Sequence, residues 1–189
     1  MTKRLLIALG LLGCLAVPAT AFGHPPSKAD KHNAAKECRS ERGTTDATKE
    51  AFAQKYGTAK SHYKNAFGKC VSSRARDERA ERHAAKQNAS RDCRAERSAD
   101  PGAFRMKYGT AKSHYKNAFG KCVSQAAKLN KAAADKRDRE EIKQEHEAAQ
   151  TCADERSQIG RDAFDQKYGT PKSKYRNAFG KCVSQNAKS

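Results

Sequence analysis

Apolar residues occur along the chain in one N-terminal run and in three short clusters separated by long polar stretches. In each cluster a Phe and a Tyr stand four residues apart, and a Tyr and a Phe with the same spacing follow, leading into Cys and Val. The second pair and its successors fall at i, i+4, i+7 and i+8, the spacing of one helix face. In the first cluster these residues are Tyr63, Phe67, Cys70 and Val71. The pattern predicts an all-α fold with three small apolar centres.

The clusters belong to one repeated motif. Residues 55–72 read KYGTAKSHYKNAFGKCVS, and residues 107–124 are identical to them. Residues 167–184 differ at Pro171, Lys174 and Arg176. Internal repetition of this kind predicts three copies of one structural unit, each too small to build a large core.

Within each motif the sequence predicts a turn between two helices. Gly57 directly follows the first Phe–Tyr pair, where a helix would end. Two residues compete as the start of the next helix. Pro171 in the third copy suits the first helical position after a Thr cap, whereas Asn65 in the first copy suits an N-cap. We expect a turn over residues 57–64 and helix from Ala66 onward.

Two long stretches without Gly or Pro connect the three units. They are rich in Ala, Glu, Lys, Arg and Gln, which favour helix, so each is predicted to form one long exposed helix. A loop of variable length is expected after the first cysteine of each unit, at Gly43, at Asp100–Gly102 and at Gly160. The resulting organisation is a signal peptide (1–21), a disordered tail (22–32), repeat 1 (33–72), a helical linker (73–87), repeat 2 (88–124), a second helical linker (125–146) and repeat 3 (147–189).

The first residues have the layout of a signal peptide. Lys3 and Arg4 precede an apolar run over residues 5–17, which is too short to span a bilayer. Residues 19–21 form a small-x-small cleavage pattern, and we place cleavage after Ala21. The alternative is a lipoprotein signal, because residues 11–14 read LLGC and resemble a lipobox, although the apolar run continues past Cys14. Both readings predict a secreted or otherwise extracytoplasmic protein.

Six cysteines remain after Ala21, and the predicted linkers constrain their pairing. An oxidising compartment favours disulfides, and six cysteines allow 15 connectivities. A helix between Cys70 and Cys93 would span about 35 Å, whereas a disulfide needs Cα atoms within about 7 Å. Pairing across a linker is thereby excluded, and each remaining pair would contribute on the order of 3–4 kcal/mol. The expected disulfides are Cys38–Cys70, Cys93–Cys122 and Cys152–Cys182.

The chain is strongly basic, with a formal net charge of +18. Much of this charge recurs inside the motif. A repeated cationic patch suits polyanions such as nucleic acid or acidic envelope polymers, because each phosphate or sulfate contact releases counterions and the patches add by avidity. The alternative is that the cations merely solvate a core-poor protein. The candidate polyanion-binding residues are Lys60, Lys64, Lys69, Lys112, Lys116, Lys121, Lys172, Arg176 and Lys181.

No catalytic or metal-binding arrangement stands out in the sequence. The cysteines lie far apart without a Cys-x-x-Cys, which fits disulfides better than zinc. His62 and His114 have Lys174 as their counterpart in the third copy, which excludes a His chemistry shared by all copies. His146 lacks the second His of a zinc-protease helix and is predicted to be a surface residue. With the acidic residues on the linkers, away from any expected pocket, we predict no enzyme, cofactor, metal ion or small-molecule substrate.

The signature KYGT-x-K-x-x-Y-[KR]-NAFGKCVS resembles a repeat of uncharacterised secreted bacterial proteins. The resemblance covers the three units. It implies export and repetition, and it assigns no activity and no functional residue. The leading hypothesis is therefore an exported, non-enzymatic polyanion-binding module. The alternative is a structural spacer or protein-interaction scaffold, and the oligomeric state stays open.

Overall fold

The computed structural model describes residues 25–187, and every regular element in that range is helical. The signal peptide, its cleavage site and Cys14 lie outside the described residues. The seven α-helices of the described range are α1 (Lys28–Arg42), α2 (Asp46–Tyr56), α3 (Ala66–Ala99), α4 (Pro101–Tyr108), α5 (Ala118–Ile159), α6 (Arg161–Tyr168) and α7 (Ala178–Asn186). Short 3₁₀ turns precede α3, α5 and α7: η1 (Ala59–Ser61), η2 (Ala111–Ser113) and η3 (Pro171–Ser173).

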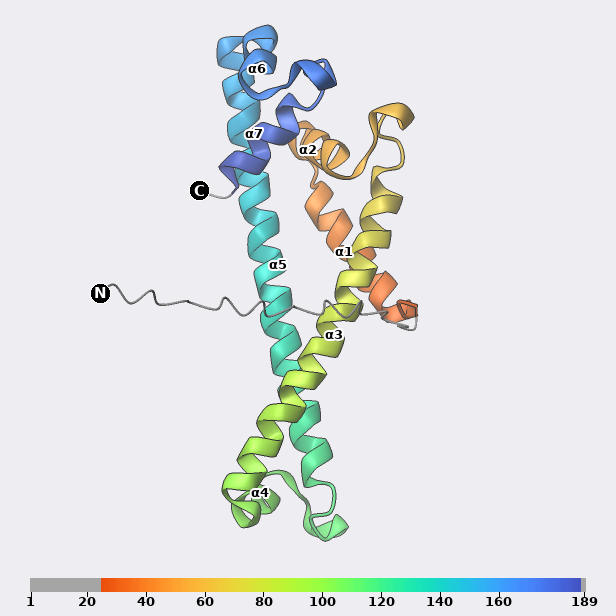
Figure 1. Ribbon diagram of the computed structural model, residues 1–189, viewed down its shortest axis with the longest axis vertical. Helices are drawn as coiled ribbons and strands as arrows, with labels where there is room; N and C mark the ends of the chain where they lie inside the picture. Colours follow the sequence, from red (N-terminus) through yellow and green to blue (C-terminus); the bar gives the residue numbers. More distant parts are fainter. Residues whose placement is uncertain (1–24, 188–189) are drawn as a thin grey trace, which may run out of the picture.

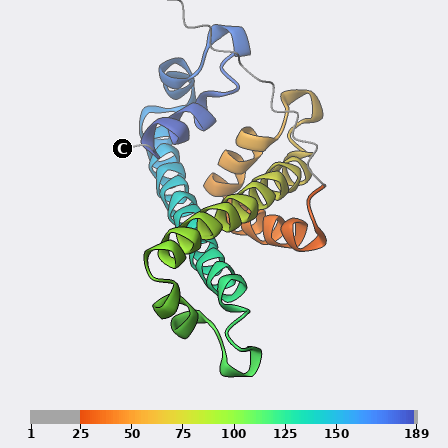
Figure 2. The same cartoon turned by 60° about the horizontal axis from the view of Figure 1, so that its bottom comes forward.

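Two long helices set the shape of the molecule. α3 has 34 residues and α5 has 42, so they are about 51 and 63 Å long at 1.5 Å per residue. They cross each other, and α1 lies alongside α3 on one side of the crossing (Figure 1). The first and third motif copies lie at one end of this elongated assembly, and the second copy lies at the other end (Figure 2).

Each motif copy is tied to its upstream helix by a disulfide. The three bonds are the expected ones, Cys38–Cys70, Cys93–Cys122 and Cys152–Cys182, with Cα atoms 6.0 Å apart in each. Around each bond lies a small apolar cluster that contains one deeply buried Phe of the motif's first pair: Phe52, Phe104 or Phe164. Cores of this size supply little hydrophobic stabilisation, so the cross-links are an important part of what holds each unit together.

The geometry of the turn within the motif explains why each copy has a glycine directly after its first Phe–Tyr pair. The backbone N–H of Gly57 donates to Ala53 O at 2.8 Å and ends α2, as predicted. The φ of Gly57 is −78°, so a left-handed backbone is not the reason for glycine here. A Cβ at this position would lie 2.5 Å from Ala53 O and 2.8 Å from Tyr63 Cα. Glycine is needed because the turn folds back directly onto the end of α2, and Gly109 and Gly169 meet equivalent atoms in their copies.

α3 begins at Ala66, as expected. The two residues considered as helix starts, Asn65 and Pro171, lie in different elements of the motif. Asn65 occupies the N-cap position without a side-chain hydrogen bond to the helix. Pro171 instead begins the 3₁₀ turn η3. Between the 3₁₀ turn and the helix, the first copy passes through two left-handed residues, His62 (φ 49°) and Tyr63 (φ 62°), and the other copies do the same.

α1 begins earlier than the sequence suggested. Ser27 caps it, and the Asp30 side chain completes a capping box. Asp30 is buried and receives two hydrogen bonds from the Arg82 guanidinium, at 3.1 and 2.9 Å. The prediction of a disordered tail is therefore wrong for residues 28–32, because a local cap and a long-range ion pair hold them in helix. Residues 22–24 lie outside the described part of the chain.

The linkers are helical, as predicted, but they are not exposed rods. α3 contacts both α1 and α5, and Ala75, Ala134 and Ile142 on the linkers are buried. The helices pack because small side chains such as these alanines allow helices to approach and cross closely, and the composition of one linker alone does not indicate such a partner. The expected loops are also shorter. Asp100 alone separates α3 from α4, and Gly102 lies inside α4.

The first and third units contact each other. Arg156 of α5 makes two hydrogen bonds of 2.8 Å to the carboxylate of Glu50 on α2. Ala47 of α2 lies in the same apolar cluster as Phe164 and Phe179 of the third unit. These two units therefore form one joined end of the molecule, while the second unit stands alone at the opposite end (Figure 1).

Candidate polyanion-binding surface

The first lysine of each motif is engaged within its own unit. Lys55 Nζ lies 2.7 Å from Glu41 Oε1, and Tyr56 OH donates to Glu41 Oε2 at 3.0 Å. The other copies repeat this arrangement: Lys107 and Tyr108 on Glu96, and Lys167 and Tyr168 on Glu155. These lysines are therefore part of the structural framework and not of a free cationic surface.

The glutamate belongs to a second repeated signal, Cys-x-x-Glu-Arg, which went unrecognised in the sequence. It reads CRSER at 38–42, CRAER at 93–97 and CADER at 152–156. About one helical turn separates Cys from Glu, so the disulfide and the carboxylate face the motif together. The neighbouring Arg lies over the second Phe of its unit, with centroid distances of 5.7, 4.9 and 4.5 Å for Arg42–Phe67, Arg97–Phe119 and Arg156–Phe179.

Glu41 is the most enclosed of these three glutamates. Its side chain is 2% exposed, against 40% for Glu96. Burial raises the pKa of Glu41, but the charges of Lys55 and Arg74 and the hydrogen bonds from Lys55 and Tyr56 outweigh burial and hold that pKa below its usual value. Burial and the Glu41 charge raise the pKa of Tyr56 to about 12. This network is internally neutralised and stabilises the unit.

The candidate polyanion-binding residues form a different class of cations. Lys60 lies in η1, Lys64 in the turn that follows, and Lys69 near the start of α3, and all three are exposed. Within the described part of the chain, none of these side chains has a carboxylate oxygen within 4.0 Å. The same holds for Lys112, Lys116, Lys121, Arg176 and Lys181, whereas the side chain of Lys172 is not among those described.

Acidic residues are absent from the motif itself. Its three copies contain 13 Lys and Arg and no Asp or Glu. The middle of α5 is different, because residues 125–149 carry six basic and six acidic residues. The motif copies, which carry this unbalanced positive charge, lie at the two ends of the molecule (Figure 1).

The motif turn also leads into an uncapped helix N-terminus. Asn65 Oδ1 accepts from Ser61 Oγ at 2.8 Å instead of capping α3. The backbone N–H groups of Phe67 and Gly68 have no acceptor within the described residues, and no atom lies within 4 Å of a Cβ built at Gly68. Unpaired amides and the positive end of the helix dipole favour an anion beside the motif lysines.

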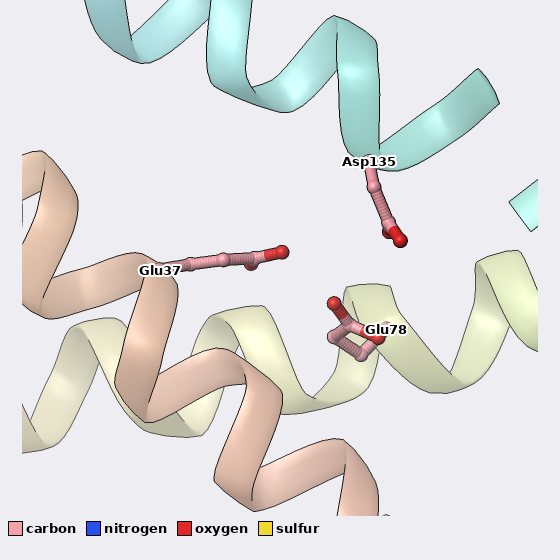
Figure 3. A group of neighbouring side chains, drawn as sticks. All are labelled: Glu37, Glu78 and Asp135. Atoms are coloured by element: carbon pink, nitrogen blue, oxygen red, sulfur yellow. The ribbon is translucent and has the colours of Figure 1, made fainter. Parts of the chain in front are cut away.

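Acidic side chains converge where α1, α3 and α5 meet. Glu37, Glu78 and Asp135 come from these three helices and point into one space, with carboxylate oxygens within 4.8 Å of one another (Figure 3). Such a set is chemically suited to a divalent cation. However, Lys131 Nζ already lies there, 3.0 Å from Glu78 and 2.9 Å from Glu81, and it also contacts Asp135.

The crossing changes the acidity of these groups. Burial, followed by the hydrogen bond and charge of Glu78, raises the pKa of Glu37 to about 8. Burial and the charge of Glu81 raise the pKa of Asp138. The expectation that the linker acids lie away from any pocket is wrong, because residues far apart in the sequence meet where the helices cross.

A cavity of about 540 Å³ lies between the first and third units. Phe52, Tyr63, Ala149 and Val183 are among its apolar lining residues. His146 also lines it, is half-buried, and places Nε2 2.8 Å from the backbone oxygen of Glu41. The prediction that His146 is a surface residue is therefore wrong, because α1 ends against it. Charged side chains of both signs line the cavity: Glu41, Lys55, Glu141, Glu145, Arg176 and Lys181.

No family model, no curated protein and no solved structure matches the chain. Among the described residues, no helix combines the length and apolar character needed to cross a membrane. Three disulfides indicate an oxidising environment outside the cytoplasm.

Proposed function

We propose that the protein is exported, has no enzymatic activity, and binds polyanions through the turns of its three motif copies. The observation that carries this proposal is the composition and placement of the motif cations. The described ones are exposed, apart from the half-buried Lys121 and Lys181, and they have no carboxylate partner. All of them come from a segment without acidic residues. The framework lysine beside them is neutralised by its own glutamate, so structural and ligand-facing charges are separated within each motif.

Binding would work by charge and geometry together. Phosphate or sulfate groups would contact the motif lysines and release counterions from the polymer. The unpaired N–H groups of Phe67 and Gly68 would donate hydrogen bonds to one anionic oxygen at the helix N-terminus. Each unit alone would bind weakly, and copies held in one molecule would add by raising the effective concentration of the next contact.

The proposal includes the repeat architecture and the compartment. Three disulfide-clipped helical units would be joined by the long helices α3 and α5, after removal of residues 1–21 by signal cleavage. Disulfide-stabilised units suit an extracytoplasmic protein with little apolar core. Nucleic acid and acidic envelope polymers are the polyanions available in such a compartment.

The test is a salt series of duplex-DNA and heparin affinities for the oxidised mature chain. A first variant replaces six motif cations by Gln: Lys60, Lys64, Lys112, Lys116, Lys172 and Arg176. A matched control replaces six exposed cations of the helix middles by Gln: Arg76, Lys86, Lys128, Lys136, Arg137 and Arg139.

We expect the motif variant to lose more than about tenfold in affinity and to show a shallower salt slope, and the control to lose about threefold or less. Equal losses in the two variants would mean that the protein responds to net charge alone. Loss of all wild-type binding by about 0.1 M salt would refute the proposal.

A spacer or protein-interaction scaffold is the second candidate function. It is favoured by the long helices that cross at fixed contacts and hold the two ends apart (Figure 2). This function predicts capture of a protein partner that does not weaken with salt and does not depend on the motif lysines.

A further inference from the structure

We propose that one molecule of this protein bridges two separate polyanion segments. The inference rests on the proposed function and adds a consequence of the architecture. Of the three motif turns, those at residues 59–69 and 171–181 lie at one end of the molecule, and the turn at 111–121 lies at the opposite end (Figure 1, Figure 2). The sequence repeats alone did not reveal this arrangement.

The two ends are far enough apart to act independently. α3 begins at Ala66 beside the first turn and ends at Ala99 in the second unit, a distance of about 50 Å along the helix axis. The Debye length at physiological ionic strength is about 8 Å. A polymer bound at one end therefore neither screens nor repels a polymer at the other end appreciably.

The connection between the ends is rigid. α3 and α5 run without a Gly or Pro through the crossing. Arg82 of α3 holds Asp30 of α1 with two hydrogen bonds, and Lys131 of α5 joins Glu78 and Glu81 of α3. A flexible connection would let both ends fold onto one polymer, whereas this connection keeps them apart.

The central part of α5 offers little attraction to a polyanion lying lengthwise. Residues 125–149 carry equal numbers of basic and acidic residues, and the crossing carries the carboxylates of Glu37, Glu78 and Asp135. A single straight polymer along the molecule would meet this balanced region between two basic ends. Two polymers, one at each end, avoid it.

The ends are unequal. The joined first and third units carry two motif turns, and the second unit carries one. The two-turn end should bind first and more tightly through its local avidity, and the second unit should then capture another segment. Bridging is therefore expected to rise with protein concentration, reach a maximum, and decline at higher concentration. It declines because each polymer segment is then occupied by a protein molecule of its own.

The test uses immobilised biotinylated duplex DNA, a second fluorescent duplex, and the oxidised mature chain at physiological salt. Two variants replace the lysines at corresponding positions of the two identical motif copies, which lie at opposite ends of the molecule. The first is K112Q/K116Q/K121Q, which neutralises the one-turn end. The matched control is K60Q/K64Q/K69Q, which leaves both ends with a charged turn. Circular dichroism and the absence of free thiols check that both variants are folded.

We expect K112Q/K116Q/K121Q to remain on the immobilised duplex and to lose capture of the second duplex by at least about tenfold. K60Q/K64Q/K69Q should bind the immobilised duplex more weakly and still capture the second one. Equal capture by the two variants, as a dimer of the chain would give, overturns the inference. Wild-type binding without capture overturns it and leaves the proposed function intact, whereas no wild-type binding at this salt removes both.

Discussion

The side-chain oxygen of Gln54 on α2 accepts a hydrogen bond of 2.8 Å from the backbone N–H of Gly180 on α7. Gly180 is the counterpart, in the third copy, of Gly68 and Gly120. A Cβ added at Gly68 or Gly120 would meet nothing outside its own helix within 4 Å. The helix N-terminus that is open in the first two copies is thus partly filled in the third by an oxygen from the first unit. The contact joins two units and makes the three motif copies unequal.

Gln54→Ala should loosen the joined end of the molecule. It removes the acceptor of Gly180 N–H and should lower the free energy of unfolding by about 1 kcal/mol. It should also open the α7 N-terminus and leave DNA affinity unchanged or slightly higher. Urea unfolding measures the first effect and the DNA titration the second. Gln150→Ala is the control, because Gln150 is exposed and its side chain bonds, among the described residues, to Asp154 one turn away. The unfolding midpoint of this variant should stay near that of the wild type.

Gly57→Ala should destabilise the first unit although Gly57 has an ordinary φ. The added Cβ would collide with the backbone of Ala53 and Tyr63, so the turn must shift, at a cost of about 2–3 kcal/mol. Gly68→Ala, in the same motif, adds its Cβ into open space within a helix and should stabilise by about 0.5–1 kcal/mol. Thermal unfolding of the two variants measures the difference. A Gly57→Ala variant as stable as the wild type, or as stable as Gly68→Ala, would show that the close approach of the turn is not the reason for glycine at position 57.

Local features of the fold were predictable from the sequence, because they depend on neighbouring residues. Helix from Ala66 follows from spacing within one helix, and the disulfide pairing follows from the length of the linkers. The crossing of α3 with α5 was not predictable, because its contacts join residues such as Lys131 and Glu78 that lie far apart in the chain. The periodicity of one helix predicts which of its faces is apolar, but it does not predict which other helix packs against that face.

The candidate site was predictable in composition but not in arrangement. The motif lysines are evident from repetition, whereas their division between two ends depends on the packing of the first unit against the third. The Glu41 network could have been predicted from the sequence, because Cys-x-x-Glu-Arg recurs in every unit.

Glu41→Gln should destabilise the protein at neutral pH. The substitution leaves Lys55 and Arg74 beside a neutral amide in a nearly closed site, and we expect a loss of about 2–4 kcal/mol. The folded pKa of Glu41 lies below its usual value, so its contribution is present above the unfolded pKa and disappears as the pH falls through the folded one. Urea unfolding at a series of pH values from 7 downward should give a large difference from wild type at pH 7 that shrinks as the pH falls below the unfolded pKa and through the folded one. Glu96→Gln, at a less buried position, should cause a smaller loss, and an equal loss would argue against burial as the cause.

Glu37→Gln should change the response of stability to alkaline pH. The folded pKa of Glu37 is raised to about 8, so its contribution is full below the unfolded value and is lost as the pH rises through 8. The groups that act on it or lie beside it are Arg74 and Glu78 of α3 and Asp135 and Asp138 of α5, and Lys131 contacts Glu78 and Asp135. Glutamine imitates the protonated acid, so wild type and variant should match below the unfolded pKa, at about pH 4. At pH 9 the variant should be more stable by on the order of 1–2 kcal/mol, after allowance for solvent screening. Chemical unfolding from about pH 4 to about pH 9 measures this, with Glu140→Gln as an exposed control. Parallel curves for wild type and Glu37→Gln would contradict the raised pKa of Glu37.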